Sequence, residues 1–150
     1  MARQINEAGL DLVKRNEGLR LTSYQDVAGI WTIGYGHTPA QPDTTITEEQ
    51  ATSLLIGDLG LAEGTVDAAT ADVATGDNQF AAMVSLAFNI GGNAYRSSTV
   101  LRLHRAGDYA GAADAFLMWD KSRVGGQLTT VPGLLRRRQE ERTLYLAATA

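Results

Sequence analysis

The first hydrophobic positions of the chain repeat with the spacing of an α-helix. Small or apolar side chains follow the series i, i+3, i+4, i+7 and i+8, at Ile5, Ala8, Gly9, Leu12 and Val13. This spacing places them on one face of an amphipathic helix. Glu17 follows Val13 by four residues, so it lies at the edge of the same face, and Gly18 is a suitable C-cap. We therefore predict a first helix that ends at Glu17.

Residues 20–38 replace this pattern with residues that favour β-strands. The strand formers are Leu21, Tyr24, Val27, Ile30, Trp31, Thr32, Ile33 and Tyr35, and glycines interrupt them at positions 29, 34 and 36. Such runs bounded by glycine are typical of short antiparallel strands. We predict one hairpin, or a small three-stranded sheet, with a turn near Asp26–Gly29. Pro39 and Pro42 end this region in a loop.

A second helix is predicted from a local motif. Thr47 and Gln50 have the spacing of a capping box, which opens a helix that extends to about Leu59. Residues 60–76 are rich in Ala, Gly, Thr and Asp, which fits either a continued helix of weak propensity or a connector between lobes. The segment from Phe80 to Ile90 is apolar almost all round, as expected of a helix in the centre of a core.

The ends of the later helices are marked by capping residues. Asp77 or Asn78 is predicted to cap the central helix, and the glycine pair 91–92 to end it. Ser97 or Ser98 caps a helix that Gly107 closes, and Asp108 starts another. The glycine pair 125–126 makes a loop, and Pro132 precedes the last helix.

With one small β element, the chain is predicted to be α+β. We expect a single domain over residues 1–150, with a small β lobe at about 18–60. Its larger lobe is a helical bundle over about 77–150 together with the N-terminal helix.

Composition narrows the possible chemistry. The chain has 150 residues, of which 44% are hydrophobic and 20% charged, as in ordinary globular domains. Cysteine is absent, which excludes disulfides, a cysteine nucleophile and thiolate metal sites. No apolar run is long enough for a membrane span, and the first residues lack the core of a signal peptide. Export would then need a separate route, unless the chain has been trimmed.

Charge is distributed unevenly along the chain. Residues 1–95 carry four Lys/Arg against twelve Asp/Glu, which is −8, whereas residues 96–150 carry nine against five, which is +4. The basic part would suit an anionic polymer held on one side of a cleft. Ordinary solvated surface charge explains the same pattern.

Three residues suggest hydrolysis of a glycosidic bond. Inverting glycosidases use a carboxylic acid to protonate the leaving oxygen and a second carboxylate to activate water. Glu17 suits the acid because burial at an apolar helix edge favours its neutral form. Asp26, in a polar turn, should stay ionised, and the Thr32 hydroxyl could orient the water. The alternatives are a surface glutamate, an Asx-turn aspartate and a threonine present for β propensity.

The residues around this trio resemble a known family. Glu17-Gly18-Leu19-Arg20-Leu21, Tyr24-x-Asp26 and Trp31-Thr32-Ile33-Gly34-Tyr35-Gly36-His37-Thr38 resemble the T4- and P22-like phage lysozymes, an endolysin family of muramidases. Leu86-Ala87-Phe88-Asn89-Ile90-Gly91 is similar to the central-helix segment of the family. Trp119, Gly125-Gly126, Gly133-Leu134 and Arg137-Arg138 with Glu141 are similar to its C-terminal pattern. Residues 55–76 carry little of the resemblance.

The resemblance implies a two-lobed lysozyme-like fold with a cleft between the lobes. It also implies hydrolysis of the β-1,4 bond between N-acetylmuramic acid and N-acetylglucosamine in bacterial peptidoglycan. Glu17 would be the general acid, and Asp26 with Thr32 would position and activate the water. Phe88 and Asn89 would line the cleft, although T4-like members have Gln where this chain has Asn89. Arg137 would approach and orient Glu17.

Other kinds of site have weaker support. The two histidines, His37 and His104, form no metal-binding pair, so we expect no metal and no cofactor. His37 is expected to be structural, and His104 to be solvated. Adjacent arginines at 136–138 point around about 200° of a helix, so nucleic-acid binding is not expected. Ser85 and Ser97–Ser98 lack a nucleophile elbow, and Gly34-x-Gly36 is an incomplete dinucleotide loop.

The predicted protein is a bacteriolytic phage enzyme that acts as a monomer on peptidoglycan glycan strands, without inserting into a membrane. It would be made in the host cytoplasm and reach the wall through a holin-type pore. Two alternatives are a lytic transglycosylase and an inactive wall-binding protein.

Overall fold

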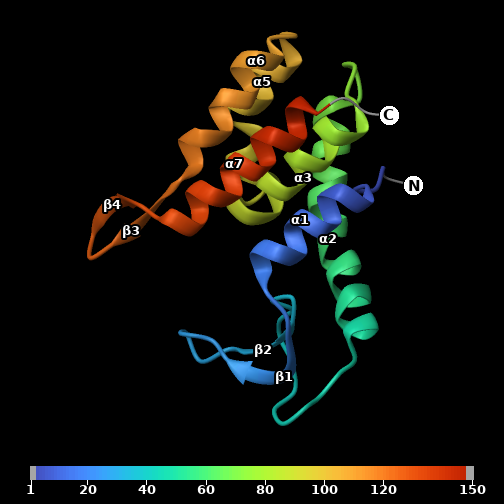
Figure 1. Ribbon diagram of the computed structural model, residues 1–150, viewed down its shortest axis with the longest axis vertical. Coiled ribbons are helices and arrows are strands. Elements are labelled where there is room, and N and C mark those ends of the chain that lie inside the picture. The colour runs from blue at the N-terminus through green and yellow to red at the C-terminus, as the bar shows by residue number, and fades with distance from the viewer. Residues whose placement is uncertain (1–2, 148–150) are drawn as a thin grey trace. The chain divides into compact units, whose positions relative to one another are not determined.

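The computed structural model describes residues 3–147 and divides into two compact units (Figure 1). One unit, here the hairpin unit, is Val13–Leu61. The other, the helical unit, combines the residues up to Leu12 with those from Ala62 onward. Each of two helices, α1 (Glu7–Glu17) and α2 (Glu48–Thr70), has residues in both units.

The hairpin unit contains the predicted antiparallel hairpin. Its strands are β1 (Arg20–Gln25) and β2 (Trp31–Gly34), with Tyr24 opposite Thr32 and Gln25 opposite Trp31. The predicted turn lies between them, where Gly29 donates its N–H to the Asp26 carbonyl at 2.9 Å. A single bridge between Thr22 and Thr45 adds the following loop to the outer edge of β1.

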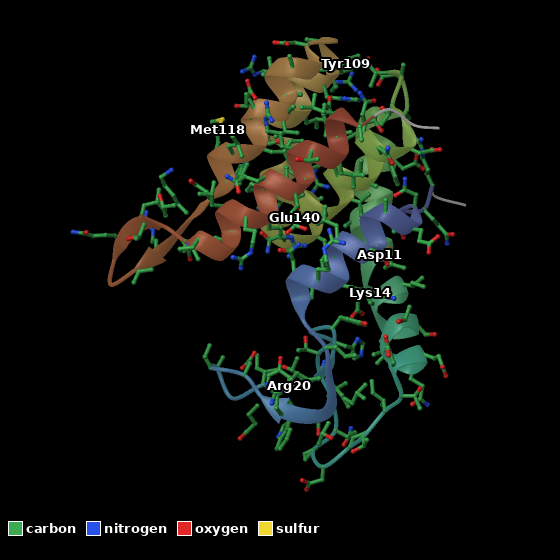
Figure 2. All side chains as sticks on the ribbon, in the orientation of Figure 1. Asp11, Lys14, Arg20, Tyr109, Met118 and Glu140 are labelled. Carbon is green, nitrogen blue, oxygen red and sulfur yellow. The ribbon has the colours of Figure 1, made fainter. Side chains whose placement is uncertain are left out.

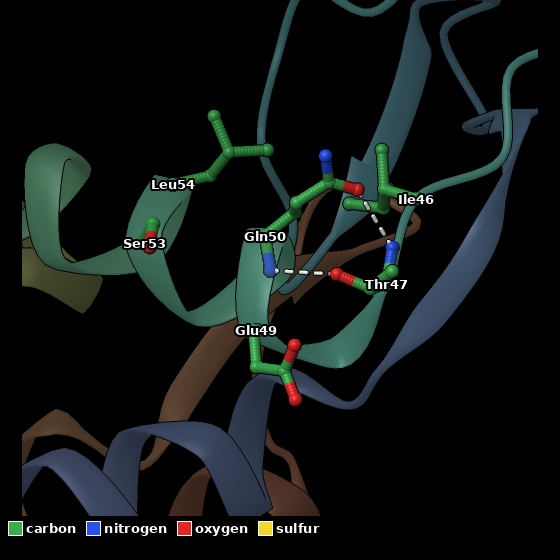
Figure 3. Close-up of a pocket in the computed structure, with 6 residues that line it drawn as sticks. All are labelled: Ile46, Thr47, Glu49, Gln50, Ser53 and Leu54. Carbon is green, nitrogen blue, oxygen red and sulfur yellow. Dashed lines mark hydrogen bonds between the residues drawn. The ribbon is translucent and has the colours of Figure 1, made fainter.

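Helix α2 begins at the predicted capping box (Figure 3). The Thr47 hydroxyl accepts from the Gln50 N–H at 3.1 Å, and the Gln50 carboxamide accepts from the Thr47 N–H at 2.9 Å. These reciprocal bonds satisfy two donors that a helix start leaves unpaired. The buried apolar side chains of the hairpin unit are Val13, Ile33, Tyr35, Ala51, Leu55 and Leu59.

Of the two alternatives for residues 60–76, the structure shows a continued helix for most of the segment. Helix α2 extends to Thr70, and a loop then leads to the next helix. The continuation has a cost in helix propensity, since α2 contains glycines at positions 57, 60 and 64. No neighbouring atom lies within 4 Å of the place where a Cβ would stand on any of the three. Packing therefore does not require these glycines.

Gly60→Ala should stabilise the protein, because alanine loses less backbone entropy in a helix and meets no neighbour here. The expected gain is about 0.5–1 kcal/mol in the free energy of unfolding, measured by urea denaturation. Gly9→Ala in α1 is the matched control, since a Cβ on Gly9 would stand 2.6 Å from the Ala81 Cβ. This second change should destabilise the protein, and a gain from both would contradict the argument.

The helical unit is built around α3 (Asp77–Ile90), which is the predicted central helix. Residues Phe80 to Ala87 are all buried, and α3 packs most extensively against α7 (Pro132–Leu146). The predicted cap was wrong: Gly76 is the N-cap, and its N–H donates to the Gln79 carboxamide at 2.8 Å. Asp77 is already in the first turn, where Arg3 pairs with its carboxylate at 2.6 Å.

Shorter helices connect α3 to the C-terminal part. They are α4 (Gly92–Arg96), α5 (Thr99–Arg105), α6 (Tyr109–Ala115) and the 3₁₀ turn η1 (Phe116–Trp119). Two predicted caps are confirmed, since the Ser98 hydroxyl accepts from the Leu101 N–H and the Asp108 carboxylate from the Gly111 N–H.

A second hairpin replaces the loop predicted around the glycine pair 125–126. Its strands are β3 (Lys121–Val124) and β4 (Gln127–Thr130), and all eight residues are exposed. Gly125 and Gly126 form the two-residue turn with φ of 58° and 83°, the left-handed backbone that glycine tolerates best. Because neither strand faces a core, no alternation of apolar and polar residues marked them in the sequence.

His104 is buried, which corrects the prediction that it is solvated. The residue is 1% exposed, with Nδ1 2.6 Å from the Tyr145 hydroxyl and Nε2 2.9 Å from the Thr75 hydroxyl. The spacing of the sequence indicates this burial, because His104 lies one helical turn after the buried Val100 and Leu101. Burial lowers the pKa of His104, and the charge of neighbouring Arg105 lowers it further.

This lowered pKa makes stability depend on pH. The neutral histidine is favoured in the folded state, so its contribution is complete above the unfolded value of 6.5 and is lost as pH falls below it. Unfolding in urea at about pH 8 and about pH 5 should show lower stability in acid, and His104→Gln should reduce this difference. An equal difference in both proteins would contradict the assignment to His104.

Candidate active site

Glu17 is the last residue of α1 and is half-buried. The helix ends there because Gly18 adopts a φ of 75°, which stops the helical path. The Glu17 Oε1 atom lies 3.5 Å from the point where a Cβ on Gly36 would stand. One turn earlier, the Lys14 ammonium lies 5.8 Å from the centre of the Tyr35 ring. The end of α1 therefore lies against the turn that follows β2.

Asp26 opens the turn between β1 and β2. Its Oδ1 atom accepts from the Ala28 N–H at 2.8 Å and from the Ile30 N–H at 2.9 Å. This is the Asx-turn arrangement, and it explains locally why aspartate suits this position. Both bonds go to Oδ1, and Oδ2 accepts none from residues 3–147. The carboxylate is therefore fixed in orientation and keeps one oxygen for another donor.

Thr32 lies on β2 and is 4% exposed. Its hydroxyl donates to the Ile30 carbonyl at 3.1 Å, which leaves its oxygen lone pairs for another donor. The same carbonyl accepts from the Asp26 N–H at 2.9 Å. The Ile30 N–H thus donates to the Asp26 carboxylate, and the Ile30 carbonyl accepts from both the Asp26 N–H and the Thr32 hydroxyl. The structure brings Asp26 and Thr32 together at one end of the hairpin.

His37 follows the Gly34–Gly36 turn and fastens it to α2. Its backbone pairs with Ile33 in both directions, at 3.0 and 2.8 Å. Its Nδ1 atom lies 2.8 Å from the Asp58 carboxylate. These contacts hold the turn beneath Glu17, which suits the supporting role predicted for His37.

The other predicted site residues belong to the helical unit. Phe88 is half-buried and Asn89 exposed, both near the end of α3. Arg137 on α7 is 3% exposed, and its guanidinium lies 3.4 Å from the carbonyl and hydroxyl of Ser85. The roles predicted for these three residues in binding sugar and orienting Glu17 stay predictions.

A buried charge cluster adjoins Arg137 and was not predicted. Arg138 and Glu141 are each 0% exposed, and Arg138 Nε lies 2.6 Å from Glu141 Oε1. Glu141 Oε2 also accepts from the Ser85 hydroxyl at 2.5 Å. Burial raises the pKa of Glu141, and the two arginines oppose this shift. Burial also lowers the pKa of Arg138, against the pull of Glu141.

An open groove of about 690 Å³ lies at the start of α2 (Figure 3). Its lining is Ile46, Thr47, Glu49, Gln50, Ser53 and Leu54. None of these is a predicted site residue, and the polar groups of Thr47 and Gln50 are already used in the capping box. The groove therefore contains none of the predicted catalytic residues.

Within residues 3–147, no three His, Asp or Glu side chains are grouped so that they could hold a metal ion. In the same range, no helix combines the length and the apolar character that crossing a membrane requires.

Comparison with known proteins identifies close relatives. The family model for phage lysozyme matches residues 14–141. An endolysin of Acyrthosiphon pisum secondary endosymbiont phage 1 is 44% identical over 145 residues, covering 96% of this chain and 99% of that protein. The endolysin of Salmonella phage P22 is 41% identical over 150 residues, covering 96% and 99%. The solved endolysin of Escherichia coli O157:H7 phage FAHEc1 has a TM-score of 0.90 at 40% identity, covering 96% and 94%.

Proposed function

We propose that this chain, which belongs to the phage lysozyme family and is a glycoside hydrolase of the endolysin type, hydrolyses a single kind of glycosidic bond and inverts the configuration at the anomeric carbon. The bond is the β-1,4 linkage from N-acetylmuramic acid to N-acetylglucosamine in peptidoglycan. The observation that carries the proposal is that the backbone of Ile30 forms hydrogen bonds with both Asp26 and Thr32.

Glu17 is the proposed general acid. Protonation of the leaving oxygen needs a carboxyl group that is held in place and can reach the substrate. Glu17 is half-buried at the end of a helix, and its Oε1 atom lies 3.5 Å from the point where a Cβ on Gly36 would stand. Its proton would pass to the glycosidic oxygen as the bond to the anomeric carbon breaks.

Asp26 and Thr32 are proposed to prepare the attacking water. The Asp26 oxygen that accepts no backbone bond can take a proton from the water as it attacks. The Thr32 hydroxyl donates to Ile30, so its oxygen can accept the second water hydrogen. Water would then attack the face opposite the leaving group, and the product would be the α anomer.

The released fragments test the reaction type. Purified sacculi would be digested and the muropeptides analysed by mass spectrometry, with proton NMR of the first product formed. We expect reducing ends that carry one added water, and the α anomer before mutarotation. Anhydro-muramic ends would instead show a lytic transglycosylase, and binding without any product would show an inactive wall-binding protein. A β anomer would overturn inversion alone.

The route to the wall is part of the proposal. We expect a monomer that stays in the host cytoplasm until a pore made by another protein admits it to the wall. Expression of the chain alone should leave bacteria intact, and permeabilising the membrane should then cause lysis. Lysis without permeabilisation would contradict this route.

A further inference from the structure

Arg20 has no role in the reaction above, yet its charged group is held in a defined place. It is exposed at the start of β1 (Figure 2), and its guanidinium carbon lies 4.3 Å from the centre of the Tyr24 ring. Arginine stacks well on aromatic faces, and the stack limits the freedom of its side chain. Within residues 3–147 the guanidinium has no carboxylate partner and donates no hydrogen bond. Its donors therefore remain available to a ligand.

The stacked pair lies on the face of the hairpin that carries the proposed water-activating residues. Tyr24 is directly opposite Thr32 in the antiparallel register, and opposite residues project from the same face. Asp26 lies in the turn one residue after the end of β1, and it shares Ile30 with Thr32 as a hydrogen-bond partner. A substrate that contacts Asp26 and Thr32 would therefore pass close to Arg20.

The hairpin unit has a negative net charge, which makes the positive charge of Arg20 relevant to substrate binding. Residues 13–61 hold three basic side chains (Lys14, Arg15 and Arg20) against six acidic ones, which is −3. A negatively charged substrate would be repelled by this unit, and most strongly beside Glu17 and Asp26. A guanidinium with free donors on the same face is the group that best offsets the repulsion, because it pairs with carboxylates through two parallel hydrogen bonds.

We infer that Arg20, stacked on Tyr24, binds a carboxylate of the peptide stem attached to the muramic acid of the substrate. The inference rests on the proposed function, since it assumes that the hairpin face contacts peptidoglycan. It predicts that the enzyme prefers glycan whose stem peptides carry free carboxylates.

Kinetics with two matched substrates test this contact. One substrate is peptide-bearing glycan with free carboxylates, and the other is the same material with its carboxylates converted to methylamides. Wild type should cleave the free form with a kcat/KM about ten- to a hundredfold higher, mostly through KM, as expected for a charge-assisted pair. Arg20→Gln should lose this preference and match wild type on the methylamide. Arg20→Lys should keep part of it.

Arg123→Gln is the control, because it removes one exposed positive charge from β3 without touching the hairpin unit. It should leave the preference unchanged. The inference is overturned if wild type shows no preference, if Arg20→Gln slows both substrates equally, or if Arg123→Gln abolishes the preference as well. Failure of wild type to cleave either substrate would instead overturn the proposed function.

Discussion

Glu17→Gln is expected to lower the rate of lysis of purified sacculi by about 10²–10⁴-fold, the range found for loss of a general acid. Glutamine has nearly the same shape as glutamic acid, but its amide cannot give up a proton to the leaving oxygen. Because glutamine keeps the shape of the side chain and its capacity for hydrogen bonds, the free energy of unfolding should stay close to that of wild type.

Turbidity of a sacculus suspension measures this loss, with thermal unfolding followed in parallel. Glu49→Gln is the matched control, because Glu49 is an exposed carboxylate of the same unit at the start of α2. It should retain full activity. Full activity in Glu17→Gln would end the proposed mechanism, and unfolding of that variant would show that Glu17 is structural.

Glu141→Gln is expected to destabilise the protein by about 3–5 kcal/mol, because it leaves a buried arginine without its counter-ion. Arg138 is 0% exposed and lies 2.6 Å from the Glu141 carboxylate, so water cannot replace the lost partner. Arg137 and Ser85 also contact this carboxylate, at 3.5 and 2.5 Å. The melting temperature should fall by roughly 6–20 °C for a chain of this size.

Urea denaturation of the two single variants, Glu141→Gln and Arg142→Gln, compares the loss of a buried ion pair with the loss of an exposed one. Arg142 pairs with Asp114 at 2.9 Å, but their side chains are 39% and 67% exposed. Loss of that pair should cost less than about 1 kcal/mol, as is usual at surfaces. If both variants lost the same small amount, the buried pair would not stabilise the helical unit.

Short-range contacts explain which features could be predicted from the sequence. The Thr47–Gln50 capping box, the Ser98 and Asp108 caps, the helix end at Gly18 and the Asp26 turn each involve residues within four positions of one another. Asp26 and Thr32 belong to this group because each bonds to the backbone of Ile30, four and two positions away. The family resemblance covered the same residues.

Other features depended on residues far apart in the chain. His104 meets Tyr145 across 41 positions, and Ser85 meets Glu141 across 56, so their burial follows from the packing of α3, α5 and α7. The second hairpin was missed because its strands face no core. For the proposed acid, the sequence alone determined that a glutamate ends α1. Only the tertiary structure decided that this end packs against the Gly36 turn, because that contact joins a helix and a turn that no local pattern connects.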